Sequence, residues 1–449
     1  MYISRVRLQN IRGFHDVRDV DLNLTRPDGS HAGWTVIAGR NGSGKTSLLR
    51  AIALAVSGPA VTRNLVSDFE DWVSVGKDLA VADVSLWFEN GIDHWSDPGH
   101  VPNNPLRIGL RWMRQISETE GIRGLQPSLV GSGSSKAANR GPWADNPVGW
   151  FCAAYGPFRR LAGGSGEAQR LMLSSGTAAR VASLFHEDAS LTEGVGWLIE
   201  QHLRAYERRP GAQELKDTAI TILSDGLLPD GYQIVDVDSD GLWVDNDGHR
   251  FPLREMSDGY RTVAALVVDL IKQITETYGT LPTPIAGRPV IHWPGVVIID
   301  EVDAHLHVSW QKRIGGWLKD HFPNVQFIVT THSPYVCQAA DEGGLIRLPG
   351  PDEDDAPRVV DKSLYERVVF GSGDDAILSE FFGLDTPYSP RAERMRRELV
   401  ALEVEVITGK ATADQVDEYQ RLKRQLTSSP VARADEVAAR LAMPVESDS

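Results

Sequence analysis

The chain has 449 residues, enough for one large or two modest domains, and its 41% hydrophobic content excludes a disordered protein. The formal net charge of −15 argues against a surface coated with basic residues for nucleic acid. Only Cys152 and Cys337 occur, so we predict no disulfide framework. The apolar runs are too short to span a bilayer and Met1–Arg5 is not a signal region, so we expect a cytoplasmic protein with no membrane partner.

A glycine-rich loop lies between a predicted strand, Trp34–Ala38, and a predicted helix, Ser47–Val56. From Gly39 to Thr46 the loop fits G-x-x-x-x-G-K-[ST] at every fixed position. Glycines allow positive φ, so that successive N–H groups can face phosphate oxygens at the helix N-terminus. The pattern predicts an ATP site in which Lys45 reaches the β and γ phosphates and the Thr46 hydroxyl ligates Mg²⁺. The loop residues that we expect to touch ATP are Gly39, Asn41, Gly42, Ser43, Gly44, Lys45, Thr46 and Ser47.

The middle of the chain predicts a side sheet followed by a helical arm. Val84–Phe88 and Leu106–Trp112 alternate as half-buried strands do, whereas Ser128–Pro142 is rich in Gly, Ser and Ala and predicts a loop. Residues 167–215 are mostly helical in pattern. Because this insert lacks sustained heptads, we predict a compact helical arm over 166–230 and not a long coiled coil.

Tyr232–Leu253 alternates and contains two hairpin-turn signals, Asp240-Gly241 and Asp247-Gly248. Residues 236–241 also match the start of a calcium-binding EF-hand loop. Position twelve of that loop is Asp247 instead of Glu, and the flanks predict strands, so the pattern disfavours calcium.

Three further motifs bear on the chemistry. Ser257 and Gly259 begin a predicted amphipathic helix, Tyr260–Ile274, where they could form a second receptor for a γ-phosphate. Asp300 and Glu301 end an apolar strand, which places one carboxylate to hold Mg²⁺ and the next to polarise the attacking water. A second buried strand ends in Thr331-His332.

Met256-Ser257-Asp258-Gly259 resembles the L-S-x-G signature of ABC-type ATPases, with Met in place of Leu. In that class the signature of one subunit closes over the nucleotide of the other. The resemblance therefore implies a dimer in which ATP is sandwiched and Ser257 and Gly259 act in trans. A plain capped helix is the alternative. His332 resembles the switch histidine of the same class, which senses the γ-phosphate.

The run from Asp300 to Gln311, continued by 322–334, resembles the single-chain ATPases of bacterial defence modules: the Septu ATPase, its retron-associated relatives and the broader OLD ATPases. Residues 3–14 are similar to the opening strand of RecF and SMC-like heads, where the residue matching Arg12 lies near the nucleotide. Tyr155–Arg159 resembles a segment that these ATPases carry near the Q-loop. We find no clear Q-loop glutamine near Tyr155, which implies slow hydrolysis.

The fold class that this resemblance implies is α/β: a P-loop ABC-type ATPase head, RecF/SMC-like, over residues 1–340. Residues 341–449 would form a helical docking or oligomerisation region. In it we predict a docking helix, Ala376–Gly383, and two amphipathic helices joined by the turn Thr408–Ala413. This hairpin could bind a second copy, another protein, or its own head.

The implied function is that of a regulatory subunit in antiphage defence, which binds and hydrolyses ATP and controls a separately encoded effector, a nuclease. Its catalytic residues would be Lys45, Glu301 and His332, its metal ligands Thr46 and Asp300, and its cofactors ATP and Mg²⁺. The alternative is a RecF-like clamp that binds DNA. Three local clusters are candidate basic patches for such a partner, although an ordinary solvated surface is the favoured interpretation of each: Arg159 with Arg160; Arg204, Arg208 and Arg209; and Arg394, Arg396 and Arg397.

Overall fold

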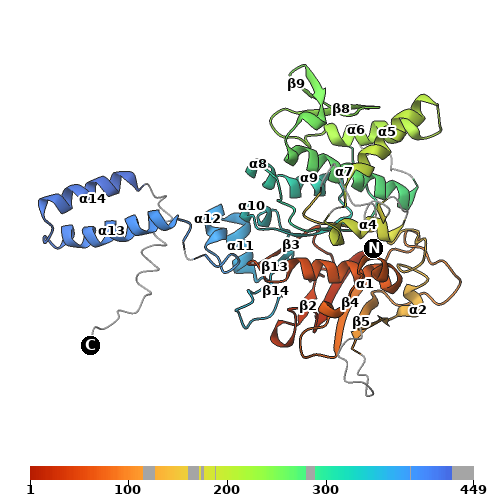
Figure 1. The fold of residues 1–449 in the computed structure, drawn as a ribbon, viewed down its shortest axis with the longest axis horizontal. Coiled ribbons are helices and arrows are strands. Elements are labelled where there is room, and N and C mark those ends of the chain that lie inside the picture. The colour runs from red at the N-terminus through yellow and green to blue at the C-terminus, as the bar shows by residue number, and fades with distance from the viewer. Residues whose placement is uncertain are drawn as a thin grey trace. The chain divides into compact units, whose positions relative to one another are not determined.

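The computed structural model describes residues 1–114, 127–159, 171–172, 176–187, 189–279, 289–384 and 386–426. It divides into two compact units, Met1–Gly383 and Leu384–Ser449 (Figure 1). The functional boundary that we predict at residue 340 stays a prediction. Arg160, the start of the predicted arm and the chain after 426 lie outside the described residues.

The first unit is built around a mixed sheet of six strands in the order β14-β13-β3-β12-β11-β7. All neighbours in it run parallel except β13 and β14. Every residue of β3, β12, β11 and the edge strand β7 is buried, as expected for strands covered on both faces. The bounds are β14 Arg358–Val359, β13 Leu345–Arg347, β3 Trp34–Ala38, β12 Val325–Thr330, β11 Gly295–Ile299 and β7 Cys152–Tyr155.

A second sheet of five antiparallel strands has the order β2-β1-β4-β5-β6. The long helix α1, Lys45–Leu65, packs against strands of both sheets and so lies between them. The predicted side sheet is confirmed by β4 and β5. The strands are β2 Val20–Asn23, β1 Tyr2–Gln9, β4 Leu79–Trp87, β5 Leu106–Met113 and β6 Ser128–Gly133.

The loop that we predicted over 128–142 is wrong, because β6 pairs with β5 and α2 follows it at Ser135–Ala138. The glycines that suggested a loop serve close packing. A Cβ at Gly131 would lie 3.0 Å from the Trp143 ring, and one at Gly133 would lie 2.5 Å from the Arg107 carbonyl oxygen.

The helical arm and the hairpins form the upper, green part of the unit in Figure 1. Helices α5 and α6 pack together, α5 packs on α7, and α6 contacts β8. The predicted hairpins are confirmed as a small sheet of three strands, β10-β9-β8. These elements are α4 Thr177–Phe185, α5 Thr192–Tyr206, α6 Ala212–Ser224, β8 Gln233–Asp238, β9 Gly241–Asn246, β10 His249–Pro252 and α7 Asp258–Tyr278.

Short helices complete the first unit after β11. They are α8 Val308–Gln311, α9 Ile314–His321, α10 Pro334–Cys337, α11 Lys362–Phe370 and α12 Gly373–Ile377. The docking helix predicted over 376–383 is therefore wrong, because α12 ends at Ile377. The Ser379 hydroxyl donates to the Ala376 carbonyl at 2.5 Å, which offers the backbone an alternative to continuing the helix.

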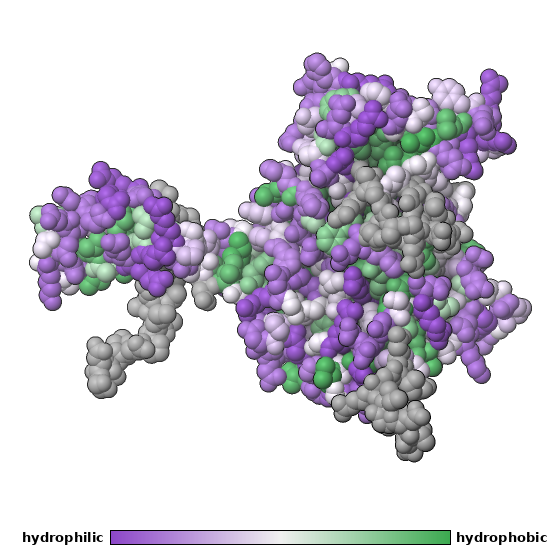
Figure 2. Space-filling model, viewed as in Figure 1, coloured by the Kyte–Doolittle hydropathy of each residue, from purple (hydrophilic) through white to green (hydrophobic). Residues whose placement is uncertain are grey.

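The second unit contains the predicted helical hairpin, α13 Pro390–Ile407 and α14 Ala413–Gln425. Thr412 and Gln415 form a capping box at the start of α14. Across the described residues, no helix is both long and apolar enough to cross a membrane. Figure 2 shows that the visible face of the first unit is mostly hydrophilic, with apolar residues in scattered patches.

Candidate active site

The sheet register explains why distant motifs meet. Thr330 at the end of β12 pairs with Ile37 of β3, and Ile299 at the end of β11 pairs with both Val329 and Tyr155. The carboxyl ends of four parallel strands therefore share one edge, which is where ligands bind in open α/β sheets. The loops that leave this edge carry the glycine-rich motif, the Asp-Glu pair, the Thr-His motif and the segment after β7.

The glycine-rich loop needs its glycines for conformation and for space. Gly42 and Gly44 have φ of 80° and 97°, in the left-handed region. A Cβ on Gly44 would lie 2.6 Å from the Phe14 ring, and one on Gly39 would lie 2.5 Å from the Leu348 carbonyl oxygen. The loop is thus wedged between the first unit's N-terminal segment and the loop after β13.

Lys45 begins α1 with only 7% of its surface exposed. Its Nζ donates to the carbonyl oxygens of Gly39 at 2.8 Å and Arg40 at 3.2 Å. Burial lowers the pKa of Lys45, and the charges of Asp300 and Glu301 oppose that shift. The ammonium group therefore lies inside the loop, facing the two acids.

The remaining loop residues differ in exposure. Asn41 is exposed, whereas Ser43 is buried, and its Oγ has no hydrogen-bond partner among the residues that the structure describes. The Ser43 carbonyl accepts a bond from Arg18 Nη2 at 3.2 Å, and the same nitrogen donates to the Pro349 carbonyl at 3.1 Å. Arg18 therefore ties the glycine-rich loop to the loop after β13.

The two predicted metal ligands are in direct contact. Thr46 Oγ1 donates to Asp300 Oδ2 at 2.7 Å, and Thr330 Oγ1 donates to Asp300 Oδ1 at 2.5 Å. Asp300 is 1% exposed. Hydroxyl and carboxylate oxygens are hard donors, the kind that Mg²⁺ prefers, so Thr46 and Asp300 fit this ion. Among the described residues, no group of three or more His, Cys, Asp or Glu side chains forms another metal site.

Glu301 lies one residue beyond Asp300, with a φ of 46°. A non-glycine residue in this left-handed region costs roughly 1–3 kcal/mol and persists only where its surroundings fix it. Its N–H donates to Thr330 Oγ1 at 2.7 Å. Its carbonyl accepts a bond from the buried Arg159 at 3.0 Å. The backbone of the predicted base is thus held from two sides.

His332 follows β12 and is exposed. Although the side chain reaches solvent, the part of its ring that is buried, and then the charge of Lys45, lower its pKa, which favours a neutral imidazole at neutral pH. Its neighbour Thr331 donates from Oγ1 to Asp303 Oδ1 at 2.5 Å. The Thr-His segment is therefore fixed to the turn that carries Glu301.

Arg12 is placed beside the start of α1. Its Nη1 donates to Ser47 Oγ at 3.3 Å, and its guanidinium lies 4.6 Å from the centre of the Trp72 ring. Burial lowers the pKa of Arg12, and the charge of Arg50 adds to the shift. The structure thus brings together Arg12, Ser47 and the glycine-rich loop.

Ser257 and Gly259 are at the start of α7. Ser257 is the N-cap residue and is exposed, and its side chain makes no capping hydrogen bond. A Cβ on Gly259 would lie 2.3 Å from the His305 carbonyl oxygen, so close packing already requires a glycine here. Within the part of the chain that the structure describes, no hydrogen bond joins these two residues to the glycine-rich loop.

A small cavity of about 60 Å³ lies beside this contact and is lined by the start of α7, the His305–His307 segment and Trp310. The proposed signature therefore faces a groove formed with the segment that follows the Asp-Glu pair.

Sequence reasoning missed the roles of Arg159, Thr330 and Arg18. Thr330 is the last residue of the β12 pattern, and only the parallel register shows that its hydroxyl reaches Asp300 and Glu301. Arg159 was predicted as part of a basic patch, but it is 3% exposed. Nothing in a single sequence signals which arginine a sheet will bury.

The other candidate basic patches are partly neutralised or buried. Arg204 pairs with Glu200 at 2.8 Å, and Arg209 pairs with Glu207 at 3.2 Å. Arg396 is 7% exposed and lies over the Tyr388 ring at 3.7 Å. These contacts weaken the case for a basic groove.

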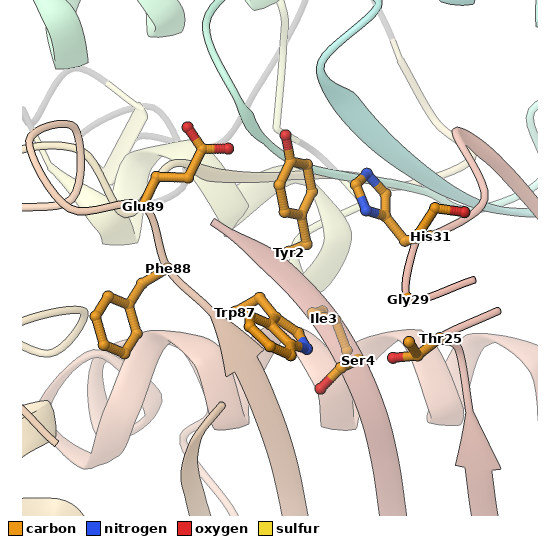
Figure 3. A pocket seen from close by; sticks show the side chains of 10 residues that line it. Tyr2, Ile3, Ser4, Thr25, Gly29, His31, Trp87, Phe88 and Glu89 are labelled. Atoms are coloured by element: carbon orange, nitrogen blue, oxygen red, sulfur yellow. The ribbon is translucent and has the colours of Figure 1, made fainter. Parts of the chain in front are cut away.

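A larger cavity, of about 230 Å³, lies where β1 begins and β4 ends (Figure 3). Figure 3 shows Tyr2 between His31 and Glu89, with Trp87 and Phe88 nearby. None of the predicted site residues lines this cavity.

Comparisons with known proteins match the two halves of this site. A family model described as "AAA domain" matches residues 5–94, and one described as "AAA domain, putative AbiEii toxin, Type IV TA system" matches residues 200–338. The chain is 23% identical to the Septu protein PtuA of Bacillus mycoides over 385 residues, which are 85% of this chain and 45% of that protein. It is 37% identical over 119 residues to the "Retron Ec83 probable ATPase" of Escherichia coli, covering 26% of this chain and 21% of that protein.

The chain thus spans less than half the length of these two curated relatives. Among solved structures, an Smc head bound to the C-terminal winged-helix domain of ScpA covers 80% of this chain and 98% of its own, with 18% identity and a TM-score of 0.45.

Proposed function

We propose, from the premise that this chain is an AAA/ABC-like ATPase related to Septu PtuA and the retron ATPases, that it binds and hydrolyses ATP. In this proposal it acts as the regulatory subunit of an antiphage defence system. It controls a separately encoded effector, a nuclease. The observation that carries the proposal is the contact of Thr46 with Asp300, with Glu301 held one residue further along the same sheet edge.

The residues divide the work as follows. The N–H groups of the glycine-rich loop and Lys45 bind the phosphates, and Arg12 lies beside them near Ser47. Thr46 and Asp300 hold Mg²⁺, which supplies neutralisation of phosphate charge when it is bound. Glu301 orients and activates the attacking water, and His332 contacts the γ-phosphate as its sensor.

Two protomers complete the site. Ser257 is exposed and its hydroxyl is not used in capping, so it is available to the nucleotide of a second copy. ATP would favour the closed pair and hydrolysis would reopen it, which is a population shift between two states. A separate effector could then respond to the nucleotide state by binding the closed and the open pair with different affinity.

The test is the mass of the protein in solution. Glu301→Gln removes the base but keeps the side-chain shape, so we expect ATP to raise the light-scattering mass twofold and to hold it there. Wild-type protein should return to its starting mass as ATP is consumed. Lys45→Ala should show no ATP-dependent change. A Glu301→Gln variant that binds ATP without gaining mass contradicts the sandwich.

A DNA-binding assay titrated with salt, with and without ATP, distinguishes the alternative function, a DNA clamp, from the regulatory ATPase. Tight ATP-dependent binding by the isolated chain would support the clamp. Co-purification of a nuclease encoded next to it would support the regulator.

A further inference from the structure

Arg159 ends the segment after β7, and 3% of its surface is exposed. From Nη1 it donates to the carbonyl oxygens of Gly156 at 3.3 Å and Asp300 at 3.1 Å. From Nη2 it donates to those of Glu301 at 3.0 Å and Val302 at 3.5 Å. Three consecutive carbonyl groups of the turn after β11 therefore converge on one guanidinium.

This guanidinium is bound differently from most buried charges. Among the described residues it forms no ion pair with a carboxylate, although buried charges are ordinarily paired. Burial lowers the pKa of Arg159 to about 10, while the charges of Asp300 and Asp303 raise it, so the group is cationic at neutral pH. Its hydrogen bonds go to the backbone of the Asp-Glu turn.

The turn needs such support because of its conformation. Glu301 has a φ of 46°, which a non-glycine residue rarely adopts. Thr330 Oγ1 accepts the Glu301 N–H at 2.7 Å on one side, and Arg159 binds the Glu301 carbonyl on the other. Loss of either contact frees the peptide groups that set the direction of the Glu301 side chain.

We propose that Arg159 is a positioning residue for ATP hydrolysis: its planar guanidinium fixes the turn Asp300–Val302 so that the Glu301 carboxylate meets the attacking water. This inference rests on the proposed ATPase function. The planar fork is essential, because a lysine keeps the charge but is a point donor that cannot span three carbonyl groups.

The test compares Arg159→Lys and Arg159→Gln with Arg180→Lys as a matched control. Arg180 is also buried, at 7% exposed, and its guanidinium donates to Thr277 Oγ1 at 2.9 Å and Thr177 Oγ1 at 3.0 Å, away from the Asp-Glu turn. For both Arg159 variants we expect kcat to fall about 10- to 100-fold, because small misplacement of a catalytic group has effects of this size. KM and the affinity for a fluorescent ATP analogue should change less than about threefold. Arg180→Lys should keep the wild-type kcat.

Three outcomes would overturn the positioning role. One is a wild-type kcat in both folded Arg159 variants. Another is an equal loss of kcat in Arg180→Lys. The last is failure of both Arg159 variants to fold while Arg180→Lys folds, which would make Arg159 a residue of stability only. Failure of the proposed function looks different: the wild-type chain itself would then show no ATP turnover that depends on Lys45.

Discussion

His31 is a residue of the first unit whose protonation the fold alters in a directly testable way. Its ring stacks on Tyr2 with centroids 3.7 Å apart, in the cavity of Figure 3. Burial, followed by the charge of Arg26, lowers its pKa from 6.5 to about 4. The folded state therefore holds the imidazole neutral through the pH range in which the unfolded chain protonates it.

The sign of the effect follows from that difference. Below pH 6.5 the unfolded state binds more protons at His31, so this contribution to stability is present above 6.5 and is lost as pH falls toward 4. His31→Gln should lose less stability than wild type over that window in urea unfolding measured at each pH. His249→Gln, on the exposed part of β10, should follow the wild-type profile. Parallel curves for wild type and His31→Gln would contradict the assignment.

At the scale of elements, the start of α7 is set by one close approach between backbones. Gly259 meets the His305 carbonyl, and His305 itself has a φ of 66°. The segment that follows the Asp-Glu pair is thus fitted against the helix that bears Ser257. We expect any side chain at position 259 to push these two segments apart.

The close fit can be tested with Gly259→Ala, and Gly196→Ala serves as the control. Gly196 lies in α5, where a Cβ would meet nothing within 4 Å. Gly196→Ala should raise the free energy of unfolding by about 0.5–1 kcal/mol, because alanine favours a helix. Gly259→Ala should lower it by roughly 1–3 kcal/mol through overpacking. Denaturant unfolding gives both values, and equal stabilisation by the two changes would refute the close fit.

Patterns in the sequence predict an element well where burial and period agree. The run Trp34–Ala38, the hairpins of 232–253 and the helix predicted over 260–274 all formed, but α7 is not half-exposed as an amphipathic helix would be, because every residue from Thr262 to Ile271 is buried. Where glycines are needed for close packing, a glycine-rich composition wrongly predicts a loop, as it did at β6. The signature glycine shows the same ambiguity, since its contact with His305 explains it without an anion.

At the scale of the whole molecule, the strands after residue 340 complete the central sheet. β13 pairs with β3, and the Leu348 N–H donates to the Ala38 carbonyl at 2.9 Å, directly before the glycine-rich loop. No sequence motif announced this strand of three residues, because its pairing is long-range. The predicted site residues could be named from local motifs, but the long-range contacts that hold them in place could not.

Two truncations test where the ATP-binding unit ends. A chain ending at Gly383 keeps the whole first unit, so it should melt cooperatively and bind ATP as the full chain does. A chain ending at residue 340 lacks β13, which leaves β3 as an unpaired edge, and it should be insoluble or melt without cooperativity. Thermal melts and ATP-analogue titrations check both. Normal ATP binding by the shorter chain would show that β13 is dispensable.

Tyr155 joins two parts of the candidate site that the sequence keeps far apart. Its carbonyl accepts the Asp300 N–H at 2.8 Å, and its buried hydroxyl donates to Asp269 of α7 at 2.9 Å. Because Tyr155 is buried, breaking either bond would leave polar groups without partners at a cost in stability, so this residue links the strand end to the helix. In the proposed pair of protomers, a displacement of α7 by the nucleotide of the other protomer would reach the peptide group of Asp300 through the side chain and the backbone of Tyr155. Tyr155 would then be sufficient to couple the two nucleotide sites of that pair.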